Sequence, residues 1–327
     1  MIRKNIQEEL GRILSPGQIR YQEPMDRHCS FRTGGPADAM VFVRTRQELA
    51  DVLRLLTSEG EEWFILGRGT NLLVGDGGYR GVIVTAVSSA GEEETAHRPG
   101  EDAPRQDDRP VRLDEVRVEK NMITAGAGAT LHEVSLAAAE HGLAGMEFAA
   151  GIPGTVGGGL VMNAGAYGGE MKQVVRSVHL LSADIREREL GPEEMQFGYR
   201  TSLLRQISAV ALSAQFELTP DDPVKIRQKI ADLAAQRREK QPLEYPSAGS
   251  TFKRPEGYFA GKLIMDAGLR GYSVGGAQVS EKHCGFVINR GGALSAQIRA
   301  LIEDVQERVF RNSGVMLERE VIYLGEF

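Results

Sequence analysis

The sequence predicts an α+β protein of two domains, and three observations lead to that prediction. At 327 residues the chain is long enough for two or three separate cores. Strand-like segments dominate up to Thr219 and mix with helical segments after it, which places a candidate domain boundary there. The 39 glycines are nearly twice the number expected from an average usage of about 7%, and they gather in clusters.

The elements of the first domain follow from hydrophobic spacing and helix-start signals. Apolar residues at helical spacing predict a short amphipathic helix near the N-terminus (Ile2, Ile6, Leu10 and Ile13). Thr45 and Glu48 form a capping box, which begins a second helix that ends at Gly60. Trp63 to Leu66 is predicted to be a buried strand, and residues 82–87, 122–125 and 210–218 are predicted to be further strands.

The second domain is predicted to begin with a helix. Asp222-Pro223 is a helix-start signal, and the helix is expected to end near Lys240, before Pro242. A last helix starts at Ser295, with apolar residues at helical spacing. We therefore divide the chain into a region 1–219, a smaller domain 220–312 and a C-terminal segment 313–327. The first region consists of residues 1–86, a surface excursion 88–110 and residues 111–219.

Composition and charge exclude several classes of protein. Cys29 and Cys284 are too few and too far apart for a disulfide framework, and no His, Cys or Asp grouping has metal-ligand spacing, so we expect a reduced, cytoplasmic compartment and no metal. No segment provides the roughly 18 apolar residues of a membrane span, and the N-terminus lacks a signal-peptide run. We expect neither membrane insertion nor secretion.

The acidic residues are unevenly placed. Residues 88–110 carry −4 of the formal net charge of −6, and they lack large apolar side chains. Such a segment cannot bury enough surface to offset the entropy of ordering, so we expect a mobile surface excursion without a catalytic role. The remainder of the chain is nearly neutral, which argues against a nucleic-acid-binding surface.

The first glycine-rich loop, GRGTNLL (67–73), follows the predicted strand 63–66. Consecutive backbone N–H groups freed by glycine can form a concave nest for an anion, and Thr70 and Asn71 add side-chain donors. The loop lacks the third glycine of a nicotinamide-binding Rossmann motif, and the chain has no GK[ST] triphosphate motif. By itself the loop is equally compatible with a tight turn that binds no ligand.

A second glycine-rich segment, GIPGTVGGGLVMNAGAYGGE (151–170), is harder to explain as a plain connector. Packed flat against a ring system, its backbone could contact a planar cofactor. Gly126, between the two segments, could line the same cleft or end a strand. Two glycine-rich segments in one strand-rich domain favour a dinucleotide with a pyrophosphate and a large planar head.

Six ordered motifs make the interpretation specific. They are SFRTGG (30–35), GRGTNLL (67–73), GIPGTVGG (151–158) with NAGAYGGE (163–170), FGYRTS (197–202), PSAGSTF (246–252) and LEREV (317–321). Together they resemble the UDP-N-acetylenolpyruvoylglucosamine reductase family of bacterial cell-wall synthesis, in its shorter type. The resemblance runs from about Arg20 to the C-terminus and is interrupted mainly by the acidic excursion.

The resemblance implies a fold and a reaction. The fold is an FAD-binding fold of the vanillyl-alcohol-oxidase type, with residues 220–312 as a second, smaller α+β domain for the substrate and residues 313–327 returning to the active-site cleft. The family uses NADPH and non-covalent FAD to reduce the enolpyruvyl ether of UDP-N-acetylglucosamine to UDP-N-acetylmuramate, a peptidoglycan precursor. A monomer is expected. The alternatives are another FAD-dependent oxidase of the same fold and a non-catalytic UDP-sugar-binding protein.

The resemblance also assigns catalytic roles. Arg200 matches the arginine that holds the substrate carboxylate, and Ser250 matches the proton donor, with Ser247 and Ser273 as its competitors. Glu320 matches the C-terminal glutamate, either as a neutral hydrogen-bond donor or as a group that polarises the enolate. Removing Glu320's charge would require a raised pKa.

The remaining assignments concern ligand contacts. Tyr199 beside Arg200 is expected to pack or orient, and other substrate contacts are expected at Tyr167, Lys240, Lys253, Lys262 and His283. The cofactor is expected at Gly67, Arg68, Gly69, Thr70, Asn71, Leu72, Gly126, Gly151, Ile152, Pro153, Gly154, Gly157, Gly158, Asn163 and Gly165. His28 aligns with a frequent family histidine but receives no role. Gly159 and Gly285 replace residues that are usual in the family, so no side-chain contact is carried over there.

Overall fold

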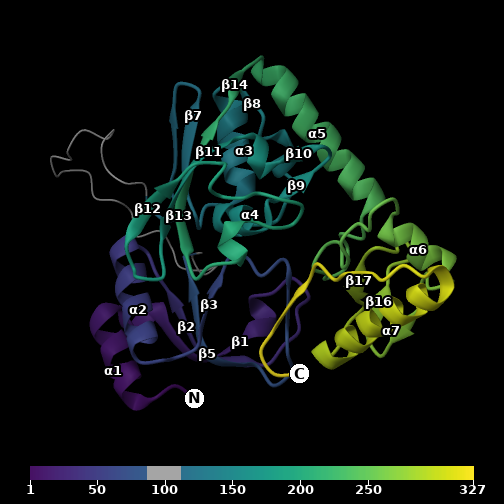
Figure 1. The fold of residues 1–327 in the computed structure, drawn as a ribbon, viewed down its shortest axis with the longest axis horizontal. Helices are drawn as coiled ribbons and strands as arrows, with labels where there is room; N and C mark the ends of the chain where they lie inside the picture. The colour runs from purple at the N-terminus through teal and green to yellow at the C-terminus, as the bar shows by residue number, and fades with distance from the viewer. Residues whose placement is uncertain (87–111) are drawn as a thin grey trace.

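Three larger sheets, three two-stranded sheets and their helices make up the computed structural model, which describes residues 1–86 and 112–327 (Figure 1). The predicted excursion 88–110 lies outside the described residues. No described helix is long and apolar enough to cross a membrane.

The first sheet has the order β1 (Ile19–Pro24), β2 (Pro36–Phe42), β5 (Tyr79–Thr85) and β3 (Trp63–Leu66). Only β1 is antiparallel to its neighbour. Helices α1 (Lys4–Ile13) and α2 (Arg46–Ser58) share a buried core with this sheet. Both helices and the strand 63–66 confirm their predictions. The predicted strand 82–87 corresponds to β5, with Val87 outside the described residues.

The second sheet is antiparallel, in the order β12 (Glu187–Leu190), β11 (Val175–Leu181), β13 (Val210–Glu217), β7 (Met122–Gly126) and β6 (Val116–Glu119). β7 and β13 confirm the strands predicted at 122–125 and 210–218. Helices α3 (Leu131–Glu140) and α4 (Val156–Met162) share its core, and neither was predicted. The signal for α3 is present in the sequence, because Thr130 and Glu133 form a reciprocal capping box.

Helix α5 (Pro223–Lys240) connects the second sheet to the third and runs along the edge of the molecule (Figure 1). Its N-terminus lies next to the two-stranded pair of β8 (Leu143–Ala144) and β14 (Thr219–Pro220). The third sheet contains β15 (Ser273–Val274), β16 (Ala277–Val279) and β17 (Val287–Asn289), with α6 (Ala260–Asp266) and α7 (Ser295–Ser313). Both α5 and α7 confirm their predictions.

The core around α7 joins distant parts of the chain. It contains residues of α6, α7 and β17 together with Met25, Phe31 and Leu73 from the N-terminal part. Asp76 caps α7 across this junction, because its carboxylate accepts the N–H groups of Ser295 and Ala296 at 2.8 Å each. The domain boundary at Thr219 therefore stays a prediction, since residues 220–312 do not enclose a core of their own.

The last strand, β18 (Ile322–Leu324), pairs in parallel with β4 (Leu72–Val74), the strand that follows the first glycine-rich loop. The chain thus ends beside a segment about 250 residues earlier in the sequence. In Figure 1 the yellow C-terminal stretch runs from the side of α6 and α7 back toward the middle of the molecule. This pairing positions the residues just before β18, which include Glu320.

Candidate active site

Arg200 and Glu320 form the centre of the candidate site. The Nε of Arg200 lies 2.8 Å from Oε1 of Glu320, and both side chains are largely buried. That Nε–H is buried and has no aligned hydrogen-bond partner in the described structure, so the pair is held by charge. Burial raises the pKa of Glu320, while Arg200, Lys253 and Arg205 oppose the rise. The carboxyl group therefore keeps its proton to a higher pH than an exposed glutamate.

A strained turn presents Arg200. Its φ of 55° is left-handed, and the turn is closed where the N–H of Gly198 donates to the carbonyl of Thr201 at 3.0 Å. The buried Asn163 at the end of α4 supports the turn by donating from Nδ2 to the Gly198 carbonyl at 3.1 Å. Asn163 also accepts the N–H of Lys172, so its amide is occupied by the protein chain. The cofactor contact that the sequence predicts for Asn163 stays a prediction, and the contacts described here are to the protein chain.

Ser250 lies beside Glu320 because the backbones of the two segments are joined. The N–H of Glu320 donates to the carbonyl of Thr251 at 2.8 Å, and the N–H of Thr251 donates to the carbonyl of Gly285 at 2.8 Å. The Ser250 side chain itself is exposed, and its hydroxyl has no partner among the described residues. The backbone bond to Thr251 therefore joins the Ser250 segment to the Glu320 segment, and the Ser250 hydroxyl is left without a described protein partner there.

Tyr199 connects the Arg200 turn to the segment after Ser250. Its hydroxyl accepts the N–H of Arg254 at 3.0 Å, and the Arg200 guanidinium lies 5.5 Å from its ring centroid. The tyrosine is about half exposed, and it contacts both the Arg200 turn and the segment after Ser250. A packing or orienting role stays the prediction for it.

The predicted substrate lysines differ in their partners. Lys253 is paired with Glu318, and Lys262 in α6 is paired with Asp266. Lys240 is exposed at the end of α5 and has no partner in the described part of the chain. His283 stacks edge-on against Phe286 with ring centroids 4.9 Å apart, and burial lowers its pKa. Tyr167 is exposed, on a left-handed backbone.

The first glycine-rich loop leaves a row of backbone donors free. Within the described residues, the N–H groups of residues 67–71 donate no hydrogen bond. Gly69 allows the tight path, since its φ is +61° and a Cβ there would lie 2.0 Å from the carbonyl oxygen of His28. Several consecutive free N–H groups suit the pyrophosphate of FAD, which is the fit that the cofactor requires.

The loop is also tied to the catalytic centre. The side-chain amide of Asn71 donates to the carbonyl of Glu320 at 3.2 Å, and the carbonyl of Asn71 accepts the N–H of Ile322 at 3.0 Å. Leu72 begins β4, Arg68 is exposed, and a Cβ on Gly67 would lie 2.7 Å from Oγ1 of Thr155. The loop therefore lies between the second glycine-rich segment and Glu320.

The sequence predicts a continuous loop for the second glycine-rich segment, but the structure contains a helix there. Residues 156–162 form α4, with Thr155 as the N-cap that accepts the N–H of Gly158. The N–H of Gly157 donates to the carbonyl of Ala127, so these glycine amides are occupied. The part before the helix faces the first loop, because a Cβ on Gly154 would lie 4.0 Å from Oγ1 of Thr70.

The other predicted cofactor positions surround this contact or lie behind it. The predicted residues Gly151 and Pro153 are exposed, Ile152 is half-buried, and Gly165 begins β9 (Gly165–Ala166). Gly126 is buried at the end of β7, where a Cβ would lie 2.2 Å from the carbonyl oxygen of Arg112. Its amide donates to Glu115, so Gly126 serves packing between chain segments.

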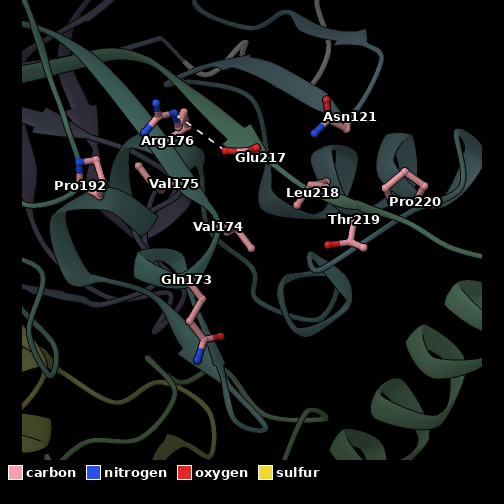
Figure 2. A pocket seen from close by; sticks show the side chains of 10 residues that line it. All are labelled: Asn121, Gln173, Val174, Val175, Arg176, Pro192, Glu217, Leu218, Thr219 and Pro220. Carbon is pink, nitrogen blue, oxygen red and sulfur yellow. Dashed lines mark ion pairs between the residues drawn. The ribbon is translucent and has the colours of Figure 1, made fainter.

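A surface depression of about 500 Å³ lies apart from all of these residues (Figure 2). It is lined by Asn121, Gln173, Val174, Val175, Arg176, Pro192, Glu217, Leu218, Thr219 and Pro220. Arg176 and Glu217 pair there at 3.9 Å, and both are exposed. The lining holds no predicted catalytic residue, and we assign the depression no part in the site. The described residues contain no His, Cys, Asp and Glu group that could hold a metal ion.

Sequence reasoning missed two arginines near the site. Arg254 donates its N–H to Tyr199 and stacks its guanidinium 4.0 Å from the ring centroid of Phe259. Arg237, in the last turn of α5, lies against Gly151. The signal for Arg237 is only the basic run at the helix end, which is also typical of a C-terminal turn that interacts with the helix dipole.

Comparisons with known proteins show the family of the chain. The profile of the UDP-N-acetylenolpyruvoylglucosamine reductase C-terminal domain matches residues 241–324, and that of an FAD binding domain matches residues 109–190. The UDP-N-acetylenolpyruvoylglucosamine reductase of Agathobacter rectalis is 47% identical over 99% of this chain and 98% of its own length. That of Clostridioides difficile is 45% identical over the whole of both chains.

A solved structure extends the likeness to the fold. The UDP-N-acetylenolpyruvylglucosamine reductase from Thermus caldophilus superposes with a TM-score of 0.72 and 30% identity, covering 94% of this chain and 98% of that one. The predicted α+β, FAD-binding fold class is confirmed, and so is the prediction of a flavin-dependent oxidoreductase. The chain belongs to the UDP-N-acetylenolpyruvoylglucosamine reductase family.

Proposed function

We propose that this protein reduces the enolpyruvyl ether of UDP-N-acetyl-3-O-(1-carboxyvinyl)glucosamine to UDP-N-acetylmuramate, with NADPH as the reductant. The observation that carries the proposal is the largely buried Arg200–Glu320 pair at 2.8 Å, whose glutamate is joined by a backbone hydrogen bond to the segment of Ser250. Family membership supports the same reaction. The reduction adds a hydride to the vinylic methylene carbon and a proton to the neighbouring carbon, which bears the carboxylate.

FAD, when bound, supplies hydride transfer between the nicotinamide and the unsaturated ether. The free N–H groups of residues 67–71 would hold its pyrophosphate, and Gly151 to Gly154 would border it from the opposite side. Asn71 links this loop to the backbone of Glu320, so the cofactor loop and the catalytic pair are positioned by one another.

Arg200 is the group that binds the substrate carboxylate. The guanidinium has more N–H donors than the contact with Glu320 and the bond from Nη1 to the Gly165 carbonyl use, so it keeps hydrogen-bonding capacity for a second anion. Charge-assisted hydrogen bonds are worth about 1.5–3 kcal/mol each. Electron density moves toward this carboxylate as the hydride adds, and the fixed positive charge of Arg200 stabilises that change.

Glu320 and Ser250 complete the reaction. Burial raises the pKa of Glu320, while Arg200, Lys253 and Arg205 oppose the rise. Glu320 acts on the substrate carboxylate either as a neutral hydrogen-bond donor or as a group that polarises the enolate. Ser250 donates its proton to the carbon next to that carboxylate, where a strongly basic centre develops. A serine hydroxyl is a weak acid, so it can serve only a carbanion-like centre held in contact with it.

An anaerobic absorbance experiment tests the proposal. The purified protein should show a flavin band that NADPH bleaches and that the enolpyruvyl UDP-sugar restores. A flavoprotein that is reduced by a simple alcohol and consumes oxygen would instead be an oxidase of the same fold. A protein that binds the UDP-sugar without any change in the flavin band would be a non-catalytic binder, and either result would refute the proposed reaction.

The finer expectations belong to the same proposal. We propose a monomeric protein in the cytoplasm, acting in peptidoglycan precursor synthesis. Size-exclusion chromatography with light scattering checks the monomer, and fractionation of the native host checks the compartment.

A further inference from the structure

Arg237 is a partly buried cation without a partner. Within the described residues its guanidinium makes no ion pair and no hydrogen bond, and burial lowers its pKa. Arg200, Lys253 and Lys262 differ from Arg237 because each pairs with a carboxylate, and Lys240, which has no partner in the described part of the chain, is exposed. A partly desolvated guanidinium without a counter-charge is strongly stabilised when an anionic ligand binds to it.

The position of Arg237 is fixed by its helix. Asp222 caps the start of α5, and Ile226 is buried against the rest of the protein. Lys229 lies 3.4 Å from the buried carboxylate of Glu147, in η3 (Glu147–Ala149). At the other end, Nζ of Lys282 donates to the carbonyl of Arg238 at 2.7 Å. α5 is therefore held at both ends, and its last turn has a defined place.

The last turn of α5 lies against the start of the second glycine-rich segment. A Cβ on Gly151 would lie 3.3 Å from Cδ and 3.5 Å from Nη1 of Arg237. Tyr167 is close enough to act on the charge of Arg237. Tyr167 lies in the hairpin of β9 (Gly165–Ala166) and β10 (Gly169–Glu170). This hairpin contacts the catalytic centre, since Nη1 of Arg200 donates to the carbonyl of Gly165 at 3.4 Å. Lys240 lies one helical turn beyond Arg237, on the same side of the helix.

Under the proposed function, three ligands could bring phosphate to this place. The pyrophosphate of FAD already has the free N–H groups of residues 67–71. NADPH and the UDP-sugar both carry a diphosphate, but only the UDP-sugar must keep its carboxylate at Arg200 while its nucleotide extends away from it. Arg237 lies against Gly151 and Arg200 bonds to Gly165, so both arginines border the second glycine-rich segment, which matches that need.

We propose that Arg237 binds the diphosphate of the UDP-sugar, in place of the carboxylate partner that it lacks. Its planar guanidinium suits two phosphate oxygens at once, whereas the lysines at the site are already paired or exposed. The inference rests on the proposed function, and it adds a substrate-binding residue that neither the motifs nor the family's catalytic positions indicate.

Titration with UDP and with uridine tests the inference on the flavin-loaded protein. Binding is followed by the change in the flavin spectrum or by calorimetry. Arg237→Ala should weaken UDP binding about 10- to 100-fold and leave uridine binding unchanged. Arg237→Lys should recover part of the loss. Arg227→Ala removes an exposed charge from the same helix and should leave UDP binding as it is.

The outcomes separate the possible sources of phosphate. Unchanged UDP binding in Arg237→Ala would overturn the inference, and so would an equal loss of uridine binding, because the effect would then not depend on phosphate. Loss of flavin from the purified variant would assign Arg237 to the cofactor and also overturn it. Failure of the wild-type protein to reduce the UDP-sugar, with UDP binding still dependent on Arg237, would refute the proposed reaction and not this binding role.

Discussion

Replacing Ser250 with alanine should slow one half of the reaction and spare the other. Its hydroxyl is exposed and unpartnered in the described structure, so the substitution should change the free energy of unfolding by less than about 0.5 kcal/mol. Loss of a positioned proton donor typically costs about 10²- to 10⁴-fold in rate. That factor corresponds to about 3–5 kcal/mol in the activation free energy. Flavin reduction by NADPH needs no proton from Ser250 and should stay within about threefold of wild type.

Stopped-flow absorbance at the flavin band measures the two half-reactions separately. Ser247→Ala is the matched control, because Ser247 lies in the same segment and its backbone pairs with Ile288. It should leave both rates near wild type. Equal slowing of flavin reduction and reoxidation in Ser250→Ala would refute the proton-donor role, as would a larger effect of Ser247→Ala on reoxidation.

Three further substitutions test other parts of the structure. Gly69→Ala should lower the flavin content after purification, because its Cβ would lie 2.0 Å from the His28 carbonyl oxygen. Gly60→Ala is the control, because Gly60 also has a left-handed φ but has open space around its Cβ position, so this variant should keep its flavin. Asp76→Ala removes two 2.8 Å bonds to the start of α7 and should lower the free energy of unfolding in urea by about 1–3 kcal/mol, with Asp76→Asn in between. Because burial raises the pKa of Glu320 above 4.5, the native state holds this proton more tightly than the unfolded state. Wild-type stability should therefore fall relative to Glu320→Gln as pH rises through the native pKa, and a constant difference from about pH 4 to about pH 8 would contradict this.

Local rules predicted much of the secondary structure. The α2 prediction rested on Thr45, which accepts the N–H of Glu48, and the α5 prediction rested on Asp222 followed by Pro223. Helix α4 was missed because glycines fill its first turns, and glycine is among the poorest helix formers. Thr155 as a cap and packing against the second sheet outweigh that low propensity. Helix propensity therefore fails to predict α4, because tertiary contacts stabilise that helix.

The sequence could assign the two glycine-rich segments to one cofactor but not their separate structures. Both segments show the same glycine enrichment, yet only residues 67–71 leave a row of N–H groups free in the described structure. In the second segment Thr155 and Ala127 occupy the amides of Gly158 and Gly157. Which amides stay free depends on carbonyl groups from other segments, and spacing along the chain carries no information about them.

The catalytic arrangement depends on contacts between segments that are far apart in sequence. Glu320 receives its position from three of them: Thr251 accepts its N–H, Asn71 donates to its carbonyl, and Arg200 pairs with its carboxylate. The parallel pairing of β18 with β4 fixes all three at once, because a shift by one residue would turn the Glu320 side chain to the opposite face. The motifs name these residues one by one, but only the strand register places them together. A substitution that shifts the register of β18 against β4 should therefore disturb the cofactor loop and the Arg200–Glu320 pair together.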